Sequence, residues 1–281
     1  MPVSGSSTAQ SRRAAAGTVS VAAMLGLPDQ IRACLFDVDG VLTKTAIVHR
    51  AAWKKTFDAF LREHPGLTAE QSREFSDDDY NAHVDGKPRH DGVRDFLTSR
   101  GIVLPEGSPD DPVEAATVAG IANRKNIVVL AELEKYGVTP YAGSLRYLEA
   151  ARSAGLRIAA VTASANGEAI IEAGGFTEFC EARIDGIVAA RENLKGKPAP
   201  DPFLAGARAL GVSASQAAVF EDAISGVQAG RAGNFGFVIG VNRVGQAQAL
   251  RENGADIVVD DLADLLDAPA PGEADTAPGG S

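Results

Sequence analysis

The sequence of 281 residues has few cysteines, an excess of acidic over basic side chains and no long apolar run. Its two cysteines, Cys34 and Cys180, lack metal-ligand spacing, and we expect buried free thiols in a reducing, cytoplasmic compartment. Lys and Arg number 27 against 37 Asp and Glu, which argues against nucleic-acid binding through a basic surface. No stretch of about 18 apolar residues occurs, so the sequence predicts no membrane span. An acidic chain can still bind phosphates where a metal ion or a few placed Lys and Arg supply positive charge.

Short apolar strands alternate with helices along much of the chain. The first strand pattern, Ala33–Val38, ends in the turn residues Asp39 and Gly40. From Gly137 onward, strand and helix patterns alternate as far as a last strand at Ile257–Val259. This alternation implies right-handed crossovers and a parallel sheet with helices on both faces, whose chemistry lies at the carboxyl ends of the strands. We therefore predict an α/β fold with a Rossmann-like, doubly wound core.

One segment interrupts the alternation. Residues 47–135 follow the first strand and show helical periodicity at Ile47–Arg62 and Ala119–Lys135, with a long polar region between them. We interpret this segment as a helical cap domain inserted over the active face. The predicted domain plan is a catalytic core at 21–46 and 136–267, a cap at 47–135, and disordered tails at 1–20 and 268–281.

Pairs of carboxylates stand at two of the predicted strand ends. Asp37 and Asp39 are two residues apart, so both can face one site, and Glu221 and Asp222 end a later strand. Neighbouring carboxylates suit a hard cation such as Mg²⁺. They also suit a division of labour in which one attacks phosphorus and the other moves a proton. Read alone, the first pair could be a surface turn, and Asp222 could be a helix N-cap.

A lysine and two hydroxyls complete this set. Pro198 stiffens the backbone beside Lys197, whose ammonium could balance a phosphoryl group. Thr162 and Ser164 follow another strand and offer hydroxyl and backbone donors. The order Asp-x-Asp-Gly, Thr, Lys, Glu-Asp resembles the haloacid dehalogenase superfamily of phosphotransferases over about residues 31–266.

The resemblance implies a covalent mechanism of phosphoryl transfer. Asp37 would form an aspartyl-phosphate and Asp39 would act as general acid/base, while Thr162 and Lys197 would hold the phosphoryl oxygens. Such transfer needs positioning and charge neutralisation more than bond-making by the protein. The implied Mg²⁺ ion would be held by Asp37, the main-chain oxygen of Asp39 and Asp222, with Glu221 close by.

The cap segment more closely resembles the β-phosphoglucomutase group of this superfamily. In that group a threonine and a histidine lie at the hinge, and the histidine links cap closure to the acid/base; these roles fall on Thr45 and His49. Trp53 would face the sugar. Read alone, His49 could be a surface histidine and Trp53 a core aromatic.

Further residues resemble the substrate contacts of the group. Arg89, in the loop that begins at Gly86, would grip the phosphate that is not being transferred, although alone it could be a solvated loop cation. The remaining implied substrate contacts are Lys125 with Asn126 in the cap, and Ser164 and Asn166 in the core.

The expected activity is the interconversion of β-glucose 1-phosphate and glucose 6-phosphate by a monomer that uses Mg²⁺. The sequence departs from the group at Ala165, where a lysine is absent, at Gly92, where a serine often stands, and in extra residues around Gly101–Pro112. Two alternatives therefore stay open, a sugar-phosphate phosphatase of the same superfamily and a non-catalytic binding module on the same fold.

Overall fold

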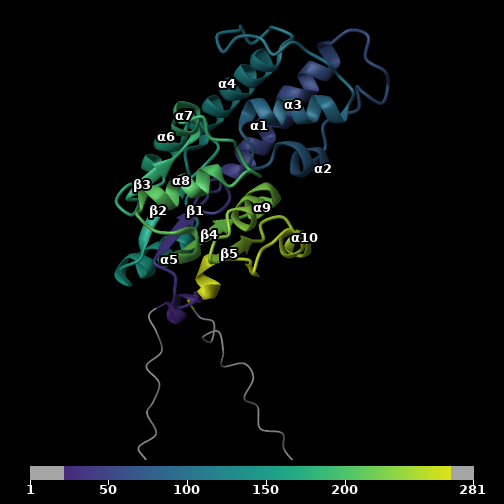
Figure 1. Cartoon of the computed structure of the whole chain (residues 1–281). Helices are drawn as coiled ribbons and strands as arrows, with labels where there is room; N and C mark the ends of the chain where they lie inside the picture. The colour runs from purple at the N-terminus through teal and green to yellow at the C-terminus, as the bar shows by residue number, and fades with distance from the viewer. Residues whose placement is uncertain (1–21, 267–281) are drawn as a thin grey trace, which may run out of the picture.

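The computed structural model describes residues 22–266, so the tails predicted at 1–20 and 268–281 lie outside the described residues. Within the described part, a six-stranded sheet carries a group of helices at one end, and both ends of the described chain lie at the opposite end (Figure 1). No helix of residues 22–266 is long and apolar enough to cross a membrane.

The sheet has the order β3-β2-β1-β4-β5-β6, and every neighbouring pair is parallel. This arrangement confirms the predicted doubly wound α/β core. Its strands are short and apolar, as expected of strands that are covered on both faces. They are β1 (Ala33–Phe36), β2 (Arg157–Val161), β3 (Ala182–Ile184), β4 (Ala217–Glu221), β5 (Phe237–Val241) and β6 (Ile257–Val259).

Helices cover both faces of the sheet, and successive residues of β1 contribute to opposite cores. Cys34 and Phe36 join one apolar cluster, which includes Tyr147 of α5, whereas Leu35 joins the other, which includes Phe203 of α8. The helices that follow or precede the strands are α5 (Ala142–Ser153), α6 (Gly167–Ala173), α7 (Gly186–Arg191), α8 (Asp201–Ala209), α9 (Ile224–Ala232) and α10 (Ala247–Glu252). Short turns of other helix types are η1 (Ala23–Leu25), η3 (Ala214–Gln216) and η4 (Leu262–Leu265).

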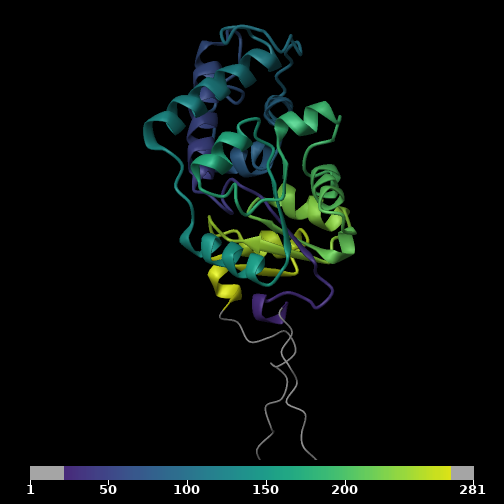
Figure 2. The ribbon, with the colours of Figure 1, turned by 90° about the vertical axis from the view of Figure 1, so that its left-hand side faces the viewer.

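The remaining helices lie together beyond the carboxyl ends of the strands, and we call residues 45–136 the cap (Figures 1 and 2). The cap has its own apolar cluster, in which the rings of Phe57, Phe75 and Phe96 have centroids 4.2 to 5.0 Å apart. Its elements are α1 (Thr45–Glu63), α2 (Asp77–Asp79), the π-helical η2 (Tyr80–Val84), α3 (Arg89–Ser99) and α4 (Val118–Tyr136).

Two helices of the cap were predicted, whereas α3 and the short α2 and η2 were missed. The predictions at Ile47–Arg62 and Ala119–Lys135 correspond to α1 and α4. In contrast, α3 lies within the segment interpreted as a long polar region, and that interpretation was wrong there. The helix buries only a narrow apolar face, made by Val93, Phe96 and Leu97, at the i, i+3, i+4 spacing that is the weak signal of such a helix.

Candidate active site

The first and fourth strands bring the carboxylates together at one edge of the sheet. The main-chain N–H of Asp37 donates to the carbonyl of Phe220 (2.9 Å), which extends the pairing of β1 with β4 into the site. Gly40 then turns the chain with φ +96°, and a Cβ at this position would lie 1.8 Å from Oδ2 of Asp222. The turn therefore requires glycine, both for its backbone conformation and for the close approach of Asp222.

Lys197 lies between two buried carboxylates. Its Nζ is 2.6 Å from Oδ1 of Asp37 and 2.5 Å from Oε1 of Glu221, and the other oxygen of Glu221 accepts from the N–H of Ala223. Burial lowers the pKa of Lys197, but Asp37 and Glu221 raise it by more, so the group stays an ammonium. Both oxygens of Glu221 thus have protein partners, and the ammonium is held in one place.

Three buried carboxylates could hold a metal ion. Ligand oxygens of Asp37, Glu221 and Asp222 all lie within 4.8 Å of one another. Burial and mutual repulsion raise the pKa values of Asp37 and Asp222 well above their ordinary range, and Lys197 only partly opposes this. A hard divalent cation with oxygen ligands would supply the missing positive charge, so the donor set fits such an ion.

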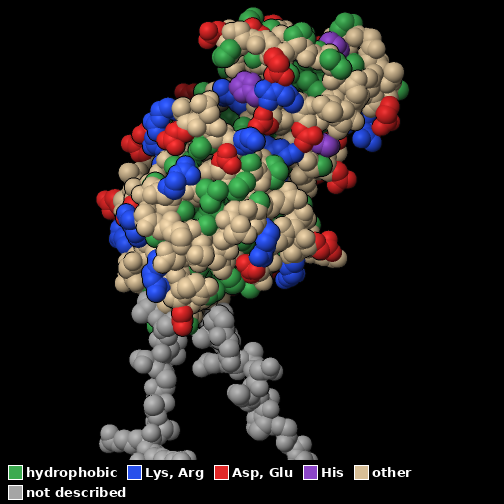
Figure 3. Space-filling view, viewed as in Figure 1, with side chains coloured by type: hydrophobic (Ala, Val, Ile, Leu, Met, Phe, Trp, Pro, Cys, Tyr) green, Lys and Arg blue, Asp and Glu red, His purple; other side chains and the backbone are tan. Residues whose placement is uncertain are grey.

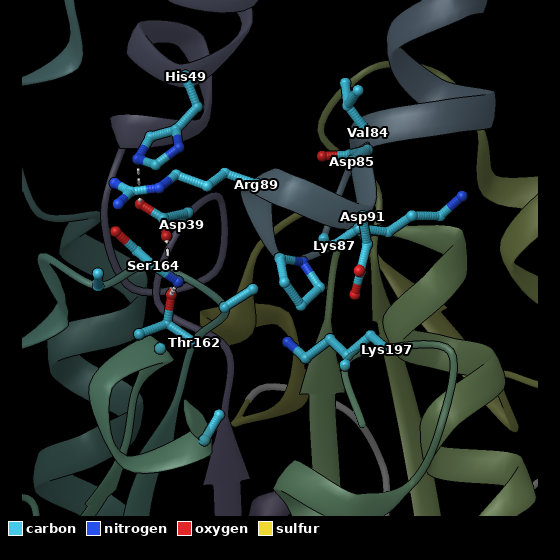
Figure 4. Close-up of a pocket in the computed structure, with 18 of the residues that line it drawn as sticks. Asp39, His49, Val84, Asp85, Lys87, Arg89, Asp91, Thr162, Ser164 and Lys197 are labelled. Carbon is cyan, nitrogen blue, oxygen red and sulfur yellow. Dashed lines mark hydrogen bonds and ion pairs between the residues drawn. The ribbon is translucent and has the colours of Figure 1, made fainter. Parts of the chain in front are cut away.

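Asp39 lies within a set of hydrogen-bond donors. The hydroxyl of Thr45, the first residue of α1, donates to Oδ1, and the hydroxyl of Thr162 donates to Oδ2 (3.0 Å). The His49 ring lies on the cap side, with Nε2 3.5 Å from Oδ1 (Figure 4). Burial opposes ionisation of Asp39, but His49 and the two hydroxyls outweigh it and lower the pKa. Asp39 is therefore prepared as a carboxylate that can accept a proton.

A second cap residue extends this network. Lys125, buried on α4, places Nζ 2.9 Å from Nδ1 of His49 and 5.0 Å from the centre of the Trp53 ring. An ammonium has donors only, so Nδ1 of His49 accepts and Nε2 carries the hydrogen that faces Asp39. Burial lowers the pKa of Lys125 to about 7 and that of His49 to about 4. The cap thus contacts Asp39 through a series of two titratable groups, Lys125 and His49.

Arg89 is the first residue of α3 and projects across the cavity toward His49 and Asp39 (Figure 4). Within residues 22–266 it forms no ion pair with an acidic side chain, and burial lowers its pKa. On the face shown in Figure 3, basic and histidine side chains gather where the cap meets the core. An uncompensated guanidinium beside Asp39 is suited to bind an anion such as a phosphate.

Apart from the bonds of Thr45 to Asp39 and Thr43 at the start of α1, two side-chain hydrogen bonds cross from the core to the cap within residues 22–266. Nδ2 of Asn166 donates to Oδ1 of Asn126 (3.1 Å), and the hydroxyl of Ser225 donates to the carbonyl of Asp85 (2.7 Å). The second contact brings Gly86 so near that a Cβ there would lie 2.4 Å from Oγ of Ser225. The described structure is therefore one in which the cap touches the core on both sides of the site.

The cavity between core and cap has a volume of about 920 Å³, at the upper end of the usual range for small-molecule sites. Thr45 and Glu221 lie behind its wall. All the other predicted site residues line it, namely Asp37, Asp39, His49, Trp53, Gly86, Arg89, Lys125, Thr162, Ser164, Asn166, Lys197 and Asp222.

Some sequence interpretations change with the structure. Asp222 does not cap α9, whose N-cap is Ala223 without a side-chain hydrogen bond. No residue of the segment Gly101–Pro112 lines the cavity, whereas Ala165 does and brings no charge to its wall. Trp53 is 3 % exposed and stacks on Phe57 in the cap core, so only part of its ring borders the cavity.

The sequence interpretation missed Asp85, which lines the cavity from the cap. Burial raises the pKa of this carboxyl to about 6, although the hydroxyl of Tyr80 lowers it by hydrogen bonding. Its only sequence signal was its place directly before Gly86, and an acid in a polar loop is usually solvated. Asp85 is half-buried because its loop docks on Ser225, which no local pattern reveals.

Comparison with known proteins gives consistent matches. The family described as haloacid dehalogenase-like hydrolase matches residues 31–234. A β-phosphoglucomutase of Mycobacterium tuberculosis is 53 % identical over 247 residues, which are 86 % of this chain and 94 % of that protein.

The structure is similar to β-phosphoglucomutase from Clostridium difficile, with TM-score 0.66, 23 % identity, and coverage of 84 % of this chain and 93 % of that one. It is also similar to CbbY from Rhodobacter sphaeroides in complex with xylulose-1,5-bisphosphate, with TM-score 0.61, 24 % identity, and coverage of 83 % and 96 %. At these identities the two solved structures establish a shared fold.

Proposed function

The chain belongs to the haloacid dehalogenase-like hydrolase family, and from this premise we propose that it catalyses the β-phosphoglucomutase reaction. This reaction interconverts β-D-glucose 1-phosphate and glucose 6-phosphate through an aspartyl-phosphate and glucose 1,6-bisphosphate. The observation that carries the proposal is the series Lys125, His49 and Asp39, in which a buried lysine and a half-buried histidine of the cap connect to the proposed acid/base. Such a link makes proton transfer depend on a closed cap, and a mutase needs that dependence to keep its aspartyl-phosphate from water. The name of the relative that is 53 % identical supports the same reaction.

Asp37 is the nucleophile in this proposal. One of its oxygens accepts from Lys197, so the other is available to attack phosphorus and form the aspartyl-phosphate. The ammonium of Lys197, fixed by Glu221, then faces the transferring oxygens and offsets their charge without reorganisation. We assign Glu221 to the orientation of Lys197, because both of its oxygens already have protein partners.

Asp39 moves the proton at the sugar. As a carboxylate it takes the proton of the 6-hydroxyl while that oxygen attacks the aspartyl-phosphate, which breaks the bond to Asp37 and gives glucose 1,6-bisphosphate. After the bisphosphate has turned end for end, its 1-phosphoryl group passes to Asp37. Asp39 then returns the proton to the leaving oxygen, and glucose 6-phosphate is released. The hydroxyls of Thr45 and Thr162 hold Asp39 in place through both halves.

Asp37, Asp222 and the main-chain oxygen of Asp39 would hold Mg²⁺. The donor set fits this ion because two of its carboxylates are buried and short of positive charge. When bound, the ion would neutralise these carboxylates and polarise the phosphoryl oxygens.

The cap and the loop after β2 hold the phosphate that is not being transferred. Arg89 supplies its guanidinium, and Lys125 adds a second cation from α4. Ser164 and Asn166 border the same part of the cavity from the core. The substrate is a small sugar phosphate, and we further propose a monomer that acts in the cytoplasm, in keeping with two cysteines that form no disulfide.

One observation favours a second candidate, a Mg²⁺-dependent sugar-phosphate phosphatase. Ala165 brings no cation to a wall of the cavity where the resembled mutases carry a lysine. The cluster of buried carboxylates argues against the third reading, a non-catalytic binding module, because burying like charges costs stability.

Simultaneous measurement of two products tests the proposal. The full chain would be incubated with β-glucose 1-phosphate, Mg²⁺ and a trace of glucose 1,6-bisphosphate, and glucose 6-phosphate and inorganic phosphate would be followed together. We expect glucose 6-phosphate to form without matching phosphate release. Phosphate release alone would replace the mutase by the phosphatase.

A further inference from the structure

The loop after β5, residues 242–246, contacts both strand ends that carry the proposed metal ligands. Nε2 of Gln246 donates to the carbonyl of Asp222 (2.8 Å), and Nε of Arg243 donates to the carbonyl of Gly40 (2.7 Å). Neither side chain lines the cavity. Both therefore act on the backbone of the site from outside, without contact to a substrate.

The two strand ends held in this way are in close contact with each other. Gly40 approaches the Asp222 carboxylate so closely that no side chain fits at that position. The peptide group that ends at the N of Gly40 contains the carbonyl of Asp39, so the orientation of the Gly40 turn decides where that oxygen points. Small displacements of either strand end would change the separation of Asp222 from the Asp39 carbonyl.

Arg243 is itself firmly fixed. Nη1 donates to the carbonyl of Asp260 (2.8 Å), and the guanidinium lies 3.6 Å from the centre of the Tyr141 ring. The N–H of Tyr141 in turn donates to the carbonyl of Leu42 (3.0 Å), beside the start of the cap. Arg243 thus connects the chain leaving the core at Gly40 with the chain returning from the cap at Tyr141. A planar guanidinium can serve these separate partners at once, and a lysine cannot.

We propose that Gln246 and Arg243 are positioning residues that set the affinity of the carboxylate cluster for a divalent cation. The inference rests on the proposed role of Asp37, Asp39 and Asp222 as ligands. Residues that hold metal ligands by hydrogen bonds typically contribute about 10- to 100-fold to metal affinity. Gln246 fixes the backbone of one ligand, and Arg243 fixes the turn that presents another.

The test measures Mg²⁺ binding to the full chain by titration calorimetry, with no substrate present. We expect Gln246→Ala and Arg243→Met each to weaken binding about tenfold, with Arg243→Lys between Arg243→Met and the unchanged protein. The kcat should recover at saturating Mg²⁺. The matched controls are Gln248→Ala and Arg231→Met. Among residues 22–266, the Gln248 side chain bonds only to Glu252 on the same helix, and that of Arg231 bonds to Gly254 and Asp256, away from the site. Both controls should leave Mg²⁺ affinity unchanged.

Asp222→Asn separates the two levels of the proposal. If this variant binds Mg²⁺ as tightly as the unchanged protein, the proposed ligand set is wrong. If Asp222→Asn loses the ion while Gln246→Ala and Arg243→Met retain full affinity, the positioning role is wrong and the ligand set stands. A lowered melting temperature with unchanged Mg²⁺ affinity in both variants would mean that the loop is only structural.

Discussion

The core half and the cap half of the site carry charge in different ways. In the core, Lys197 lies between Asp37 and Glu221, so its positive charge is compensated inside the protein. In the cap, Arg89 has no ion-pair partner within residues 22–266, and Lys125 is buried with a pKa lowered to about 7. The core charges are therefore fixed before any substrate arrives, whereas the cap cations gain most when an anion enters. This difference supports the proposal that the reacting phosphoryl group binds in the core and the second phosphate binds to the cap.

The comparison also gives a physical reason for a closing cap. A ligand shifts a conformational equilibrium only by its difference in affinity for the two states. The phosphate that is not transferred would supply that difference, because it compensates Arg89 only when the cap lies over the core. Core–cap hydrogen bonds such as that of Asn166 with Asn126 would add little to the stability of the closed state, because both groups bond to water when the cap is open.

The largest effect is expected from the core nucleophile. Asp37→Asn removes the attacking oxygen, and we expect the rate of glucose 6-phosphate formation to fall at least about a thousandfold. The fold should survive, because asparagine keeps the shape of the side chain and removes one charge from a crowded acidic cluster. Steady-state assays with circular dichroism as a check on folding would measure both. Asp110→Asn, in an exposed cap loop, is the control; turnover at the normal rate in Asp37→Asn would contradict the whole mechanism.

A smaller effect, confined to one half of the site, is expected from Arg89→Met. Loss of a charged hydrogen-bond donor to phosphate should raise the KM for glucose 1-phosphate by about 10- to 100-fold. Formation of the aspartyl-phosphate from a small phosphoryl donor should stay near its normal rate, because that step uses only the core. The two rates would be measured in parallel. Arg94→Met is a matched control, since Arg94 lies on the same helix but pairs with Asp91 and Glu106. Equal losses in both rates would remove the division between core and cap.

The sequence indicated the residues at strand ends better than the contacts that join distant parts of the chain. Asp37, Thr162 and Asp222 each come directly after a short apolar strand, and parallel strands necessarily bring such residues to one edge. The contact of Lys125 with His49 joins positions 76 residues apart on two helices, and the contact of Arg243 with Gly40 joins positions 203 apart. Only tertiary packing creates these contacts, so sequence patterns named Lys125 and His49 without their contact and gave no sign of Arg243 or Gln246 in the core.

Elements of the fold were missed for a related reason. β3 has three residues, one of which is the charged Arg183, and α7 has six. Segments of this length are too short to show a period, and β3 also lacks the unbroken apolar run that marks β6, which is equally short. Both are stabilised by neighbours instead, since β3 pairs with β2 and the Asp185 side chain caps α7 by accepting two N–H groups.

The buried cap lysine offers a stability test of the comparison. Burial lowers the pKa of Lys125 from 10.5 to about 7, so between these values the unfolded chain binds a proton that the folded chain does not. Stability should therefore rise with pH across this window, by at most about 1.4 kcal/mol per pH unit. Below about pH 7 the Lys125 side chain is protonated in both the folded and the unfolded state, so it no longer contributes to the slope. Lys125→Met should remove this slope.

Denaturant unfolding between pH 7 and 8.5 would measure the slope, because the raised pKa values of Cys34 and Cys180 affect stability mainly at higher pH. The exposed Lys55 on α1 gives the control, and Lys55→Met should keep the slope of the unchanged protein. Parallel curves of stability against pH for all three proteins would mean that Lys125 is an ordinary ammonium in the folded chain. The charge of the cap would then be stabilised within the protein, like that of Lys197 in the core.

The smallest effect is expected in the extra segment of the cap, residues 101–112. Residues 101–112 were candidates for a change of substrate, yet none lines the cavity, and Glu106 within them pairs with Arg94 on the outside of the cap. Glu106→Gln should therefore leave kcat and KM within about twofold. In contrast, Ala165→Lys would add a cation to the cavity wall beside Ser164 and should lower the KM for the sugar phosphate several-fold. If Glu106→Gln changed the KM and Ala165→Lys did not, specificity would depend on the outer surface of the cap rather than on the charges that face the cavity. The contrast between the compensated charges of the core and the uncompensated charges of the cap would then no longer explain substrate binding.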